Sequence, residues 1–192
     1  MKQTEALPAG PEWLDKDIRE FNGSPFKRIG SDWFLITAAD IKNDRGNWNT
    51  MTGAWGGLGV IWNKDVAFLF IRPSRHTFGF SNDTKVFTLS FFDERCRSAL
   101  NICGEKSGRD CDKAKDAGLT PVYFGDGPDG LSGPLSGAVS FKEASDIIIC
   151  KKIYAQDIDP KLFLDASIEK NYNGKDYHRM LIGEIIGYKT RA

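Results

Sequence analysis

The sequence is poor in the residues that most often build metal centres and hydrolytic sites. Its 192 residues include four cysteines and two histidines. Cys96, Cys103, Cys111 and Cys150 contain no Cys-x-x-Cys pair, and two histidines are too few to complete a zinc set. Neither histidine lies beside an obvious nucleophile motif. We therefore expect no structural metal, and the composition argues weakly against serine or cysteine catalysis.

Net charge and long apolar runs are also missing from the sequence. Lysine plus arginine equals aspartate plus glutamate at 26 each, so no overall field attracts nucleic acid or an anionic membrane. No apolar run reaches membrane-spanning length. Residues 1–17 contain acids and prolines but no apolar stretch, so we expect neither a signal peptide nor an anchor there. These features predict a cytoplasmic protein with reduced thiols and with neither a nucleic acid nor a membrane as partner.

What the sequence does contain is a series of short segments that resemble strands. Aromatic and β-branched residues are concentrated in them, and turn residues separate them. Strands are predicted over residues 33–38, 49–55, 64–72, 85–92, 121–124, 138–141, 146–156 and 178–189. So many strands with few helices favour a β-barrel or a β-sandwich, and the length fits one domain.

Two helices are predicted, over residues 93–104 and 109–117. In the first, Cys96 and Cys103 lie on the apolar face of a 3.6-residue period, which predicts that both pack in the core. Gly104 is expected to end this helix. These two cysteines therefore need no redox or metal role.

A pair of arginines follows the most apolar of the predicted strands. The run 66–71 is rich in aromatic and branched residues, and Pro73 prevents its simple continuation as a strand. Arg72 and Arg75 would converge at the rim of the sheet, where their planar guanidinium groups can bind phosphate oxygens and Thr77 can add a hydroxyl. An equal alternative is a pair of solvated surface arginines.

The segment 46–57 combines turn residues, small residues and hydroxyls. Small side chains let the backbone approach the edge of a planar heterocycle, two threonines offer hydroxyls on one strand face, and larger apolar side chains can lie against a ring. The residues concerned are Thr50, Met51, Thr52, Gly53, Ala54 and Trp55. Taken alone, the segment fits an edge strand with core aromatics better.

Two further places carry groups that can bind a ligand. In the cluster 104–113, Ser107, Gly108 and Lys113 could form a second wall for a phosphate or a ribityl chain at the start of the second predicted helix. A solvated turn with salt bridges explains this cluster equally well. His178 opens the last predicted strand, where a histidine is usually structural but can also donate a hydrogen bond to a ligand.

Four motifs follow one another along the chain. They are Asn49-Thr50-Met51-Thr52-x-x-Trp55, Arg72-Pro73-x-Arg75-x-Thr77, Ser107-Gly108-Arg109-Asp110-x-Asp112-Lys113 and His178-x-x-x-Ile182-Gly183-Glu184-Ile185. In this order and spacing, over roughly residues 25 to 190, the chain resembles the flavin reductase-like family of FMN-binding split barrels. An N-terminal extension and the long connection 125–137 make it look more like the flavoredoxin-type members.

The resemblance implies a mainly β fold with added helices, namely a six-stranded antiparallel Greek-key split β-barrel. The barrel domain would cover residues 25–192 after an N-terminal extension over residues 1–24. The family further implies a homodimer with one FMN per subunit near the interface. If the family's FMN-binding positions are transferred to the matching motifs of this sequence, the residues that would bind FMN are Asn49, Thr50, Met51, Thr52, Gly53, Ala54, Trp55, Arg72, Arg75, Thr77, Ser107, Gly108 and Lys113. His178 matches a histidine that lies near the flavin or nicotinamide in reductase members, so it is the candidate catalytic residue.

Three functions compete at this point. The first is an NAD(P)H-dependent flavin reductase, an enzyme that transfers a hydride from NADH or NADPH to flavin. The second is a flavoredoxin-like FMN electron carrier that a partner protein reduces. The third is a non-catalytic barrel that binds another partner. The N-terminal extension and the connection 125–137 bear on this choice, because either could cover the ring face where a nicotinamide must stack.

Overall fold

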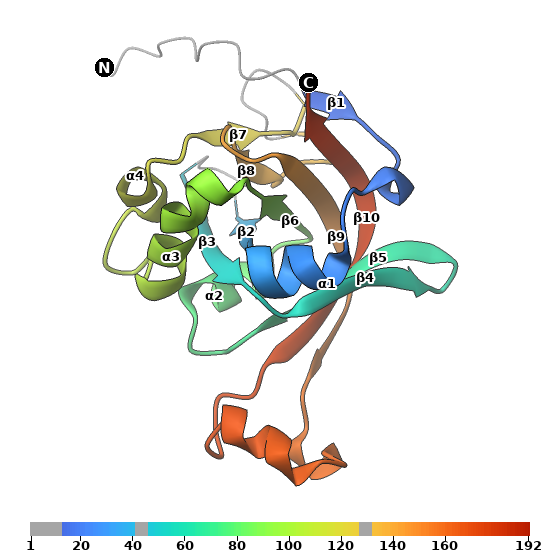
Figure 1. Ribbon diagram of the computed structural model, residues 1–192, viewed down its shortest axis with the longest axis vertical. Coiled ribbons are helices and arrows are strands. Elements are labelled where there is room, and N and C mark those ends of the chain that lie inside the picture. Colours follow the sequence, from blue (N-terminus) through green and yellow to red (C-terminus); the bar gives the residue numbers. More distant parts are fainter. Residues whose placement is uncertain (1–12, 41–45, 127–131) are drawn as a thin grey trace.

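The computed structural model describes residues 13–40, 46–126 and 132–192, and one antiparallel sheet dominates it (Figure 1). Its strands follow the order β3-β2-β6-β9-β10-β5-β4, and β1 pairs with β10 beside this path. The strands of this sheet are β1 (Trp13–Asp15), β2 (Phe34–Ala39), β3 (Trp48–Gly53), β4 (Gly56–Ile61), β5 (Lys64–Ile71), β6 (Val86–Phe91), β9 (Asp146–Asp157) and β10 (Arg179–Arg191). A separate pair joins β7 (Pro121–Tyr123) to β8 (Val139–Phe141).

The helices are short and lie around the sheet. The α-helices are α1 (Pro25–Lys27), α2 (His76–Asp83), α3 (Arg97–Glu105) and α4 (Lys113–Ala117). Shorter 3₁₀ turns cover Ile18–Glu20, Glu94–Cys96, Pro160–Leu162 and Ala166–Asn171, and a π-helical segment covers Arg28–Asp32. In Figure 1, α3 and α4 lie side by side next to β3, and they pack on each other. None of the helices in the described ranges is long and apolar enough to cross a membrane.

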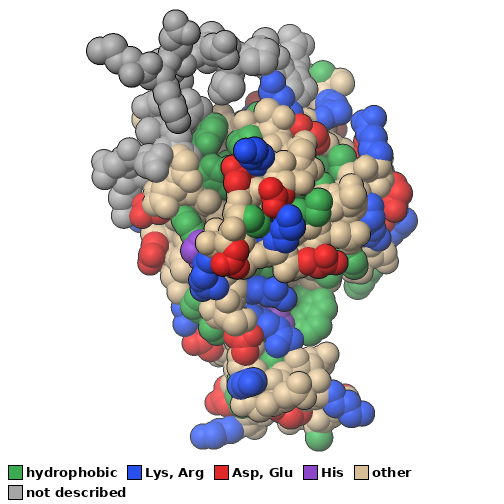
Figure 2. Space-filling model, turned by 90° about the vertical axis from the view of Figure 1, so that its left-hand side faces the viewer, with side chains coloured by type: hydrophobic (Ala, Val, Ile, Leu, Met, Phe, Trp, Pro, Cys, Tyr) green, Lys and Arg blue, Asp and Glu red, His purple; other side chains and the backbone are tan. Residues whose placement is uncertain are grey.

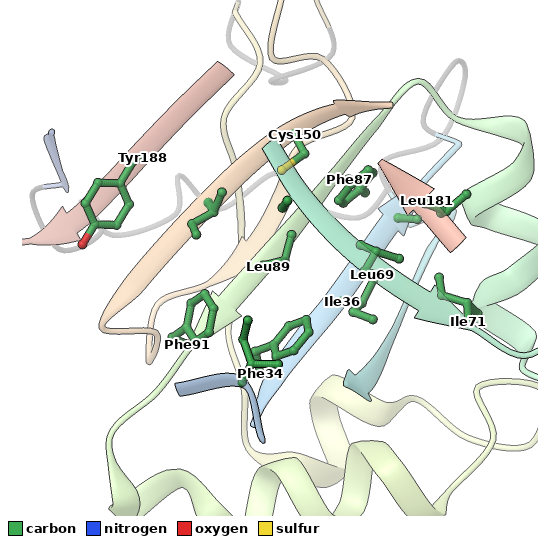
Figure 3. Close-up of a cluster of buried hydrophobic side chains, with 14 residues drawn as sticks. Phe34, Ile36, Leu69, Ile71, Phe87, Leu89, Phe91, Cys150, Leu181 and Tyr188 are labelled. Carbon is green, nitrogen blue, oxygen red and sulfur yellow. The ribbon is translucent and has the colours of Figure 1, made fainter. Parts of the chain in front are cut away.

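Strands from distant positions in the sheet share one core (Figure 3). Phe34 and Ile36 of β2 lie in the same buried cluster as Leu69 and Ile71 of β5. In each strand the two residues are two positions apart, and they face the same side because successive side chains of a strand point to opposite faces. Full burial of each such side chain contributes about 1.5 to 3 kcal/mol. The sheet therefore curls around its core, although β3 and β4 at its two ends are not paired with each other in the described ranges.

The predicted mainly β, antiparallel fold with added helices is confirmed, but the prediction of six strands is wrong. The main sheet contains eight strands, and its hydrogen bonds do not close it into a barrel within the described residues. The sequence analysis missed β4, whose glycines are unusual in a strand. At Gly56 an added Cβ would lie 2.5 Å from the carbonyl oxygen of Phe68, so the close approach of β5 excludes any side chain there.

The two predicted helices exist with different ends. α3 runs past Gly104 to Glu105, and α4 begins at Lys113 rather than at residue 109. The later start has a local cause, because the Asp112 side chain caps α4 by accepting a hydrogen bond from the backbone N–H of Lys115 at 3.1 Å. Core packing of the cysteines is confirmed, since Cys103 is buried and the partly buried Cys96 packs against the same cluster.

The chain on either side of the boundary predicted at residue 24 contacts the sheet. β1 pairs with β10, and Phe21 packs on Phe91 and Tyr188, with ring centroids 5.3 and 5.9 Å away. Residues 1–12 lie outside the described ranges, and the division at residue 24 stays a prediction. Within the connection 125–137, residues 127–131 are also outside the described ranges, while Asp126 and Ser132 form a bridge.

An arm extends from one end of the sheet. The chain between β9 and β10, residues 158–178, projects away from the body and bears two 3₁₀ turns (orange-red in Figure 1). Within the arm, Leu164 is fully exposed and Leu162 is 69% exposed. At its base, the arm returns to the body through His178, immediately before β10.

Candidate functional site

A small cavity opens where the start of α2, the end of α3 and the turn before α4 meet. Its volume is about 130 Å³. We call it the basic cavity, and it is lined by Met51, Ser74, Arg75, His76, Thr77, Gly104, Glu105, Lys106, Ser107, Arg109 and Lys113. The lining includes members of three of the four sequence motifs, which are far apart along the chain. The fold therefore brings much of the predicted phosphate site together.

The segment after β5 delivers Arg75 and Thr77 to the basic cavity. The chain turns through Pro73, with the backbone N–H of Arg75 donating to the carbonyl of Arg72 at 3.0 Å, and α2 then begins at His76. Arg75 keeps an exposed side chain, and its guanidinium makes one long contact, 3.5 Å from the Gly104 carbonyl oxygen. The guanidinium of Arg75 therefore retains donors for an anion.

Asn49 and Gly108 fix the geometry behind Thr77. The Asn49 side-chain amide donates to the Thr77 hydroxyl at 2.7 Å, and both residues are buried. An added Cβ at Gly108 would lie 2.0 Å from the Asn49 side-chain oxygen. Glycine is therefore required at residue 108 for the turn to pack against β3, so Asn49 and Gly108 shape the cavity wall from behind.

Lys113 is buried below the cavity and already has protein partners. Its ammonium donates to the carbonyl of Thr50 at 2.9 Å and to that of Cys103 at 2.8 Å. Burial lowers the pKa of Lys113, with the positive charge of Arg75 acting in the same direction. Two of the three ammonium hydrogens thus tie α4 to β3 and α3, which leaves one beyond them for a ligand.

Arg72 is not brought to the basic cavity. Its guanidinium donates to the carbonyl of Asn171 in the arm at 2.7 Å and lies over the ring of Tyr172, 5.2 Å from the centroid. Asp176 lies 4.0 Å away. The turn at Pro73 directs Arg72 and Arg75 to different places, so the predicted convergence of the two guanidinium groups is absent from this structure.

The hydroxyls of β3 face the protein rather than a ligand. The Thr50 hydroxyl donates to the Ile36 carbonyl at 3.2 Å, and the Thr52 hydroxyl donates to the Leu100 carbonyl. Gly53 is required by core packing, since an added Cβ would lie 2.8 Å from the Phe34 ring. β3 ends the sheet, so its edge away from β2 has no strand partner in the described ranges.

His178 lies in an aromatic cluster at the base of the arm. Its ring is 4.8 Å from that of Trp55, and its Nδ1 lies 3.1 Å from the Tyr172 hydroxyl. We call the cluster formed by Trp55, Arg72, Tyr172 and His178 the arm base. Burial, reinforced by the positive charge of Arg72, lowers the pKa of His178 to about 4. His178 is therefore neutral at pH 7 and brings no positive charge to a ligand.

The rest of the β3 segment runs from the basic cavity to the arm base. Met51 lines the cavity, Ala54 follows the end of the strand, and Trp55 leaves 45% of its surface exposed above His178. The predicted site residues thus form two neighbouring groups joined by residues 51–55.

Sequence reasoning missed Arg109 and His76 as lining residues. Arg109 faces back toward α2, and its guanidinium donates to the carbonyl of Ser74 at 3.3 Å. His76 begins α2 and lines the cavity beside it. Both residues lie within or next to the recognised motifs, and that position is the signal that could have identified them.

The positive charge at the cavity is a local feature. On the side of the molecule where α3 and α4 lie, basic and acidic side chains are intermixed over the surface (Figure 2). Lys106 illustrates this, because its ammonium pairs with Asp116 at 2.6 Å. Any attraction for an anion must therefore come from the few side chains that converge at the cavity.

Solved structures with the same fold include flavin-binding proteins. The FMN-binding domain of a flavin reductase-like enzyme from Shewanella baltica matches with a TM-score of 0.61, over 95% of this chain and 79% of its own, at 13% identity. The flavoredoxin of Desulfovibrio vulgaris matches with 0.59, over 82% and 68%, at 23% identity. The flavoredoxin of Methanosarcina acetivorans matches with 0.60, over 83% and 68%, at 18% identity. The chain has the fold of these flavin reductase-like proteins.

No sequence-family model matches the chain, and no curated protein matches it. The flavin reductase-like resemblance given by the four motifs is confirmed at the level of the fold. Because one fold serves many activities, cofactor and chemistry have to be argued from the residues of the site.

Proposed function

We propose that this chain binds FMN at the basic cavity and along β3, and that it acts as an NAD(P)H-dependent flavin reductase. The observation that supports this is the meeting of Arg75, Thr77, Ser107 and Lys113 at one cavity. Guanidinium, ammonium and hydroxyl groups are the donors that a phosphate monoester needs. The fold shared with FMN-binding proteins makes a flavin phosphate the natural anion.

The basic cavity suits the phosphate rather than the ring. Its 130 Å³ is well below the roughly 300 Å³ at which pockets for whole cofactors begin. Arg75 would hold the phosphate together with the hydroxyls of Thr77 and Ser107, and the buried Lys113 would add positive charge from below. The ring would then lie outside the cavity, toward Trp55.

The residues between Met51 and Trp55 would orient the ring. The small side chain of Ala54 and the free edge of β3 allow close approach of the backbone, and the exposed face of Trp55 offers apolar area. Bound FMN would supply reversible hydride and electron chemistry. We assign His178 a positioning role, since it is neutral and packs against Trp55.

The first test is a titration of FMN fluorescence with flavin-stripped protein. Saturable quenching at about one flavin per chain supports the cofactor, and absence of quenching contradicts it. The second step is anaerobic reduction of the FMN-loaded protein by NADH and, separately, by NADPH. If neither bleaches the bound flavin, the reductase activity is wrong even where FMN binds.

A flavoredoxin-like electron carrier is the second candidate. Two of the proteins with a similar fold are flavoredoxins, and His178, where the arm returns to the body, packs directly against Trp55, so that the arm would restrict access of a nicotinamide. This function expects slow bleaching by NAD(P)H and fast reduction by dithionite or a partner protein. Rapid turnover with excess NADH would exclude it. A non-catalytic barrel with another partner remains the alternative if FMN does not bind.

A homodimer with FMN near its interface forms part of the proposal. Large apolar side chains are exposed on two projections of the chain: Leu162 and Leu164 on the arm, and Val60 and Trp62 on the β4–β5 hairpin. Association with a second chain would bury these side chains, and apolar residues of this kind form the core of homodimer interfaces. Sedimentation should give twice the chain mass, and Leu164→Glu should shift the protein toward the monomer.

A further inference from the structure

Aromatic rings continue from the arm base into the arm. The ring of Trp55 lies 4.8 Å from that of His178, whose ring lies 5.5 Å from that of Tyr172. The Tyr172 ring in turn lies 4.8 Å from the ring of Tyr177. These four rings form a series of contacts from the exposed face of Trp55 to the partly buried Tyr177 on the arm, and we call this series the ring path.

Each phenol on the ring path has a proton acceptor beside it. The Tyr172 hydroxyl lies 3.1 Å from Nδ1 of His178, and the Tyr177 hydroxyl donates to Oε1 of Glu169 at 2.9 Å. Because burial lowers the pKa of His178 to about 4, its ring is neutral at pH 7, and Nδ1 can accept the Tyr172 proton when Nε2 carries the ring proton. Partial burial raises the pKa of both tyrosines, so both phenols are protonated at that pH.

These proton acceptors decide how easily the phenols lose an electron. An oxidised phenol that keeps its proton is a cation, and Arg72 already places a positive charge 5.2 Å from the centre of the Tyr172 ring. Repulsion between the two charges opposes oxidation unless the proton leaves together with the electron. Since an oxidised phenol is a much stronger acid than an imidazolium, the proton moves to His178. The geometry at Tyr172 and Tyr177 therefore suits the loss of one electron and one proton together.

We propose that the ring path carries one-electron oxidising equivalents from Trp55 to Tyr177, where a small thiol in solution reduces them. The oxidant is an oxygen-centred radical, which reaches Trp55 through its exposed face. Radicals of this class arise where reduced flavin meets dioxygen, and this source of the oxidant is the part of the inference that rests on the proposed function. The arm thus removes radicals from the neighbourhood of the site.

Electrons and protons balance at each step. At Trp55 the radical takes one electron and becomes an anion, and the indole releases its N–H proton to water. Tyr172 then gives an electron to Trp55, which regains a proton from water, while the phenol proton moves to His178. Tyr177 next gives an electron to Tyr172 and its own proton to Glu169. His178 returns its proton to Tyr172. A thiol finally gives one hydrogen atom to Tyr177 and leaves as a thiyl radical, and Glu169 releases its proton to water.

A second tryptophan–tyrosine pair supplies a control within the same chain. The rings of Trp62 and Tyr154 lie 6.0 Å apart, and both side chains are exposed. The Tyr154 hydroxyl donates to Oε1 of the Gln156 amide at 2.6 Å, and an amide oxygen is not a base at neutral pH. If ring contact alone were sufficient, Tyr154 would be oxidised as readily as Tyr177. The need for a proton acceptor predicts that it is not.

The experiment oxidises the full chain, without flavin, with azide radicals, which attack tryptophan selectively. The absorption of the phenoxyl radical gives its rate of formation and its yield, and a spin trap with peptide mass spectrometry identifies the tyrosine that holds it. We expect adducts on Tyr177 rather than on Tyr154. Tyr172→Phe should remove most of the phenoxyl radical, and His178→Gln should slow its formation by about ten-fold or more. Tyr154→Phe is the control and should change neither rate nor yield.

Two results overturn the ring path. One is as many adducts on Tyr154 as on Tyr177, and the other is a phenoxyl yield that is unchanged in Tyr172→Phe. Circular dichroism checks that each variant is folded. If Tyr172→Phe does not fold, the adducts of the wild type and the rate in His178→Gln decide the question. Because no flavin takes part in the measurement, these results are independent of FMN binding, and a failure of the proposed function is recognised separately by the fluorescence titration.

Discussion

Arg72 and Arg75 belong to one turn, yet the structure gives them opposite surroundings. At the arm base, Arg72 is satisfied by the Asn171 carbonyl and the Tyr172 ring. At the basic cavity, Arg75 stays exposed, with one long contact to a carbonyl. A guanidinium that the protein already satisfies stabilises the fold, whereas one with spare donors facing a cavity is available to a ligand.

The arm base and the basic cavity differ in the same way as these two arginines. The arm base is aromatic, and its histidine is neutral, held between Trp55 and Tyr172. The basic cavity gathers cations and hydroxyls from several segments around a space of about 130 Å³. We infer that the arm base would orient and shield the flavin ring, while the basic cavity would bind the negatively charged phosphate.

Lys113 tests the contrast most severely, because it belongs to the cavity and is also satisfied by the protein. Lys113→Met should lower the free energy of unfolding by about 3 kcal/mol, since two buried carbonyls lose their donor. Urea denaturation measures the change. Lys115→Met, at an exposed position of the same helix, is the control and should stay within about 0.5 kcal/mol of wild type. Equal stability of the two variants would show that the ammonium has no structural role.

Substitution of the two arginines should affect FMN affinity and stability differently. Arg75→Ala should weaken FMN binding by about 10- to 100-fold, the value of one or two charge-assisted contacts, with little change in stability. Arg72→Ala should leave FMN affinity within about three-fold and lower the free energy of unfolding by about 1 kcal/mol. Fluorescence titration and urea denaturation give the two numbers. A loss of FMN affinity in Arg72→Ala as large as that in Arg75→Ala would overturn the contrast and restore the convergence expected from the sequence.

The arm base should make stability depend on pH. The pKa of His178 is about 4 in the folded protein and about 6.5 when unfolded, so as the pH falls below 6.5 the unfolded chain takes up a proton first. Stability should therefore drop by about 1 to 2 kcal/mol between pH 6.5 and pH 4, and His178→Gln should flatten this part of the profile. His76→Gln is the matched control and should keep most of the slope. A profile that is unchanged in His178→Gln would contradict the assignment.

Trp55→Leu should give a small change in stability and a distinct change in the spectrum of the bound flavin. Trp55→Leu should lower the free energy of unfolding by less than about 1 kcal/mol, because almost half of the side chain is already in solvent. Circular dichroism of the bound FMN band should change, since the ring would lose its aromatic neighbour. An identical flavin spectrum in Trp55→Leu and wild type would place the ring elsewhere.

Local signals in the sequence predicted much of the fold. The core strands were predicted because aromatic and branched residues are concentrated in them and turn residues separate them. In the structure, Phe34 with Ile36 and Leu69 with Ile71 lie in one buried cluster. β4 was missed because glycine is unusual in a strand, and Gly56 is needed there only because the backbone of Phe68 in the neighbouring strand lies so close. The period of a strand is visible along the chain, but the approach of another strand is not.

The candidate site also has a part that the sequence predicted and a part that it could not predict. The motifs identified Arg75, Thr77 and Ser107, whose positions follow from short turns at the ends of regular elements. The sequence could not reveal that Arg72 is bound by the arm, because its partner Asn171 lies 99 positions away in the chain. Nor could it show that Lys113 already has two carbonyl partners.

The position of β10 has a consequence for how this protein folds as it is made. β10 lies between β9 and β5 and also pairs with β1, although it is the last element of the fold along the chain. Until β10 emerges from the ribosome, the β4–β5 hairpin has no strand to join it to the rest of the sheet. Such long-range pairing slows folding and leaves apolar strand edges exposed meanwhile. During synthesis, the strand edges of β5 and β9 that pair with β10 should therefore stay exposed until β10 has been added.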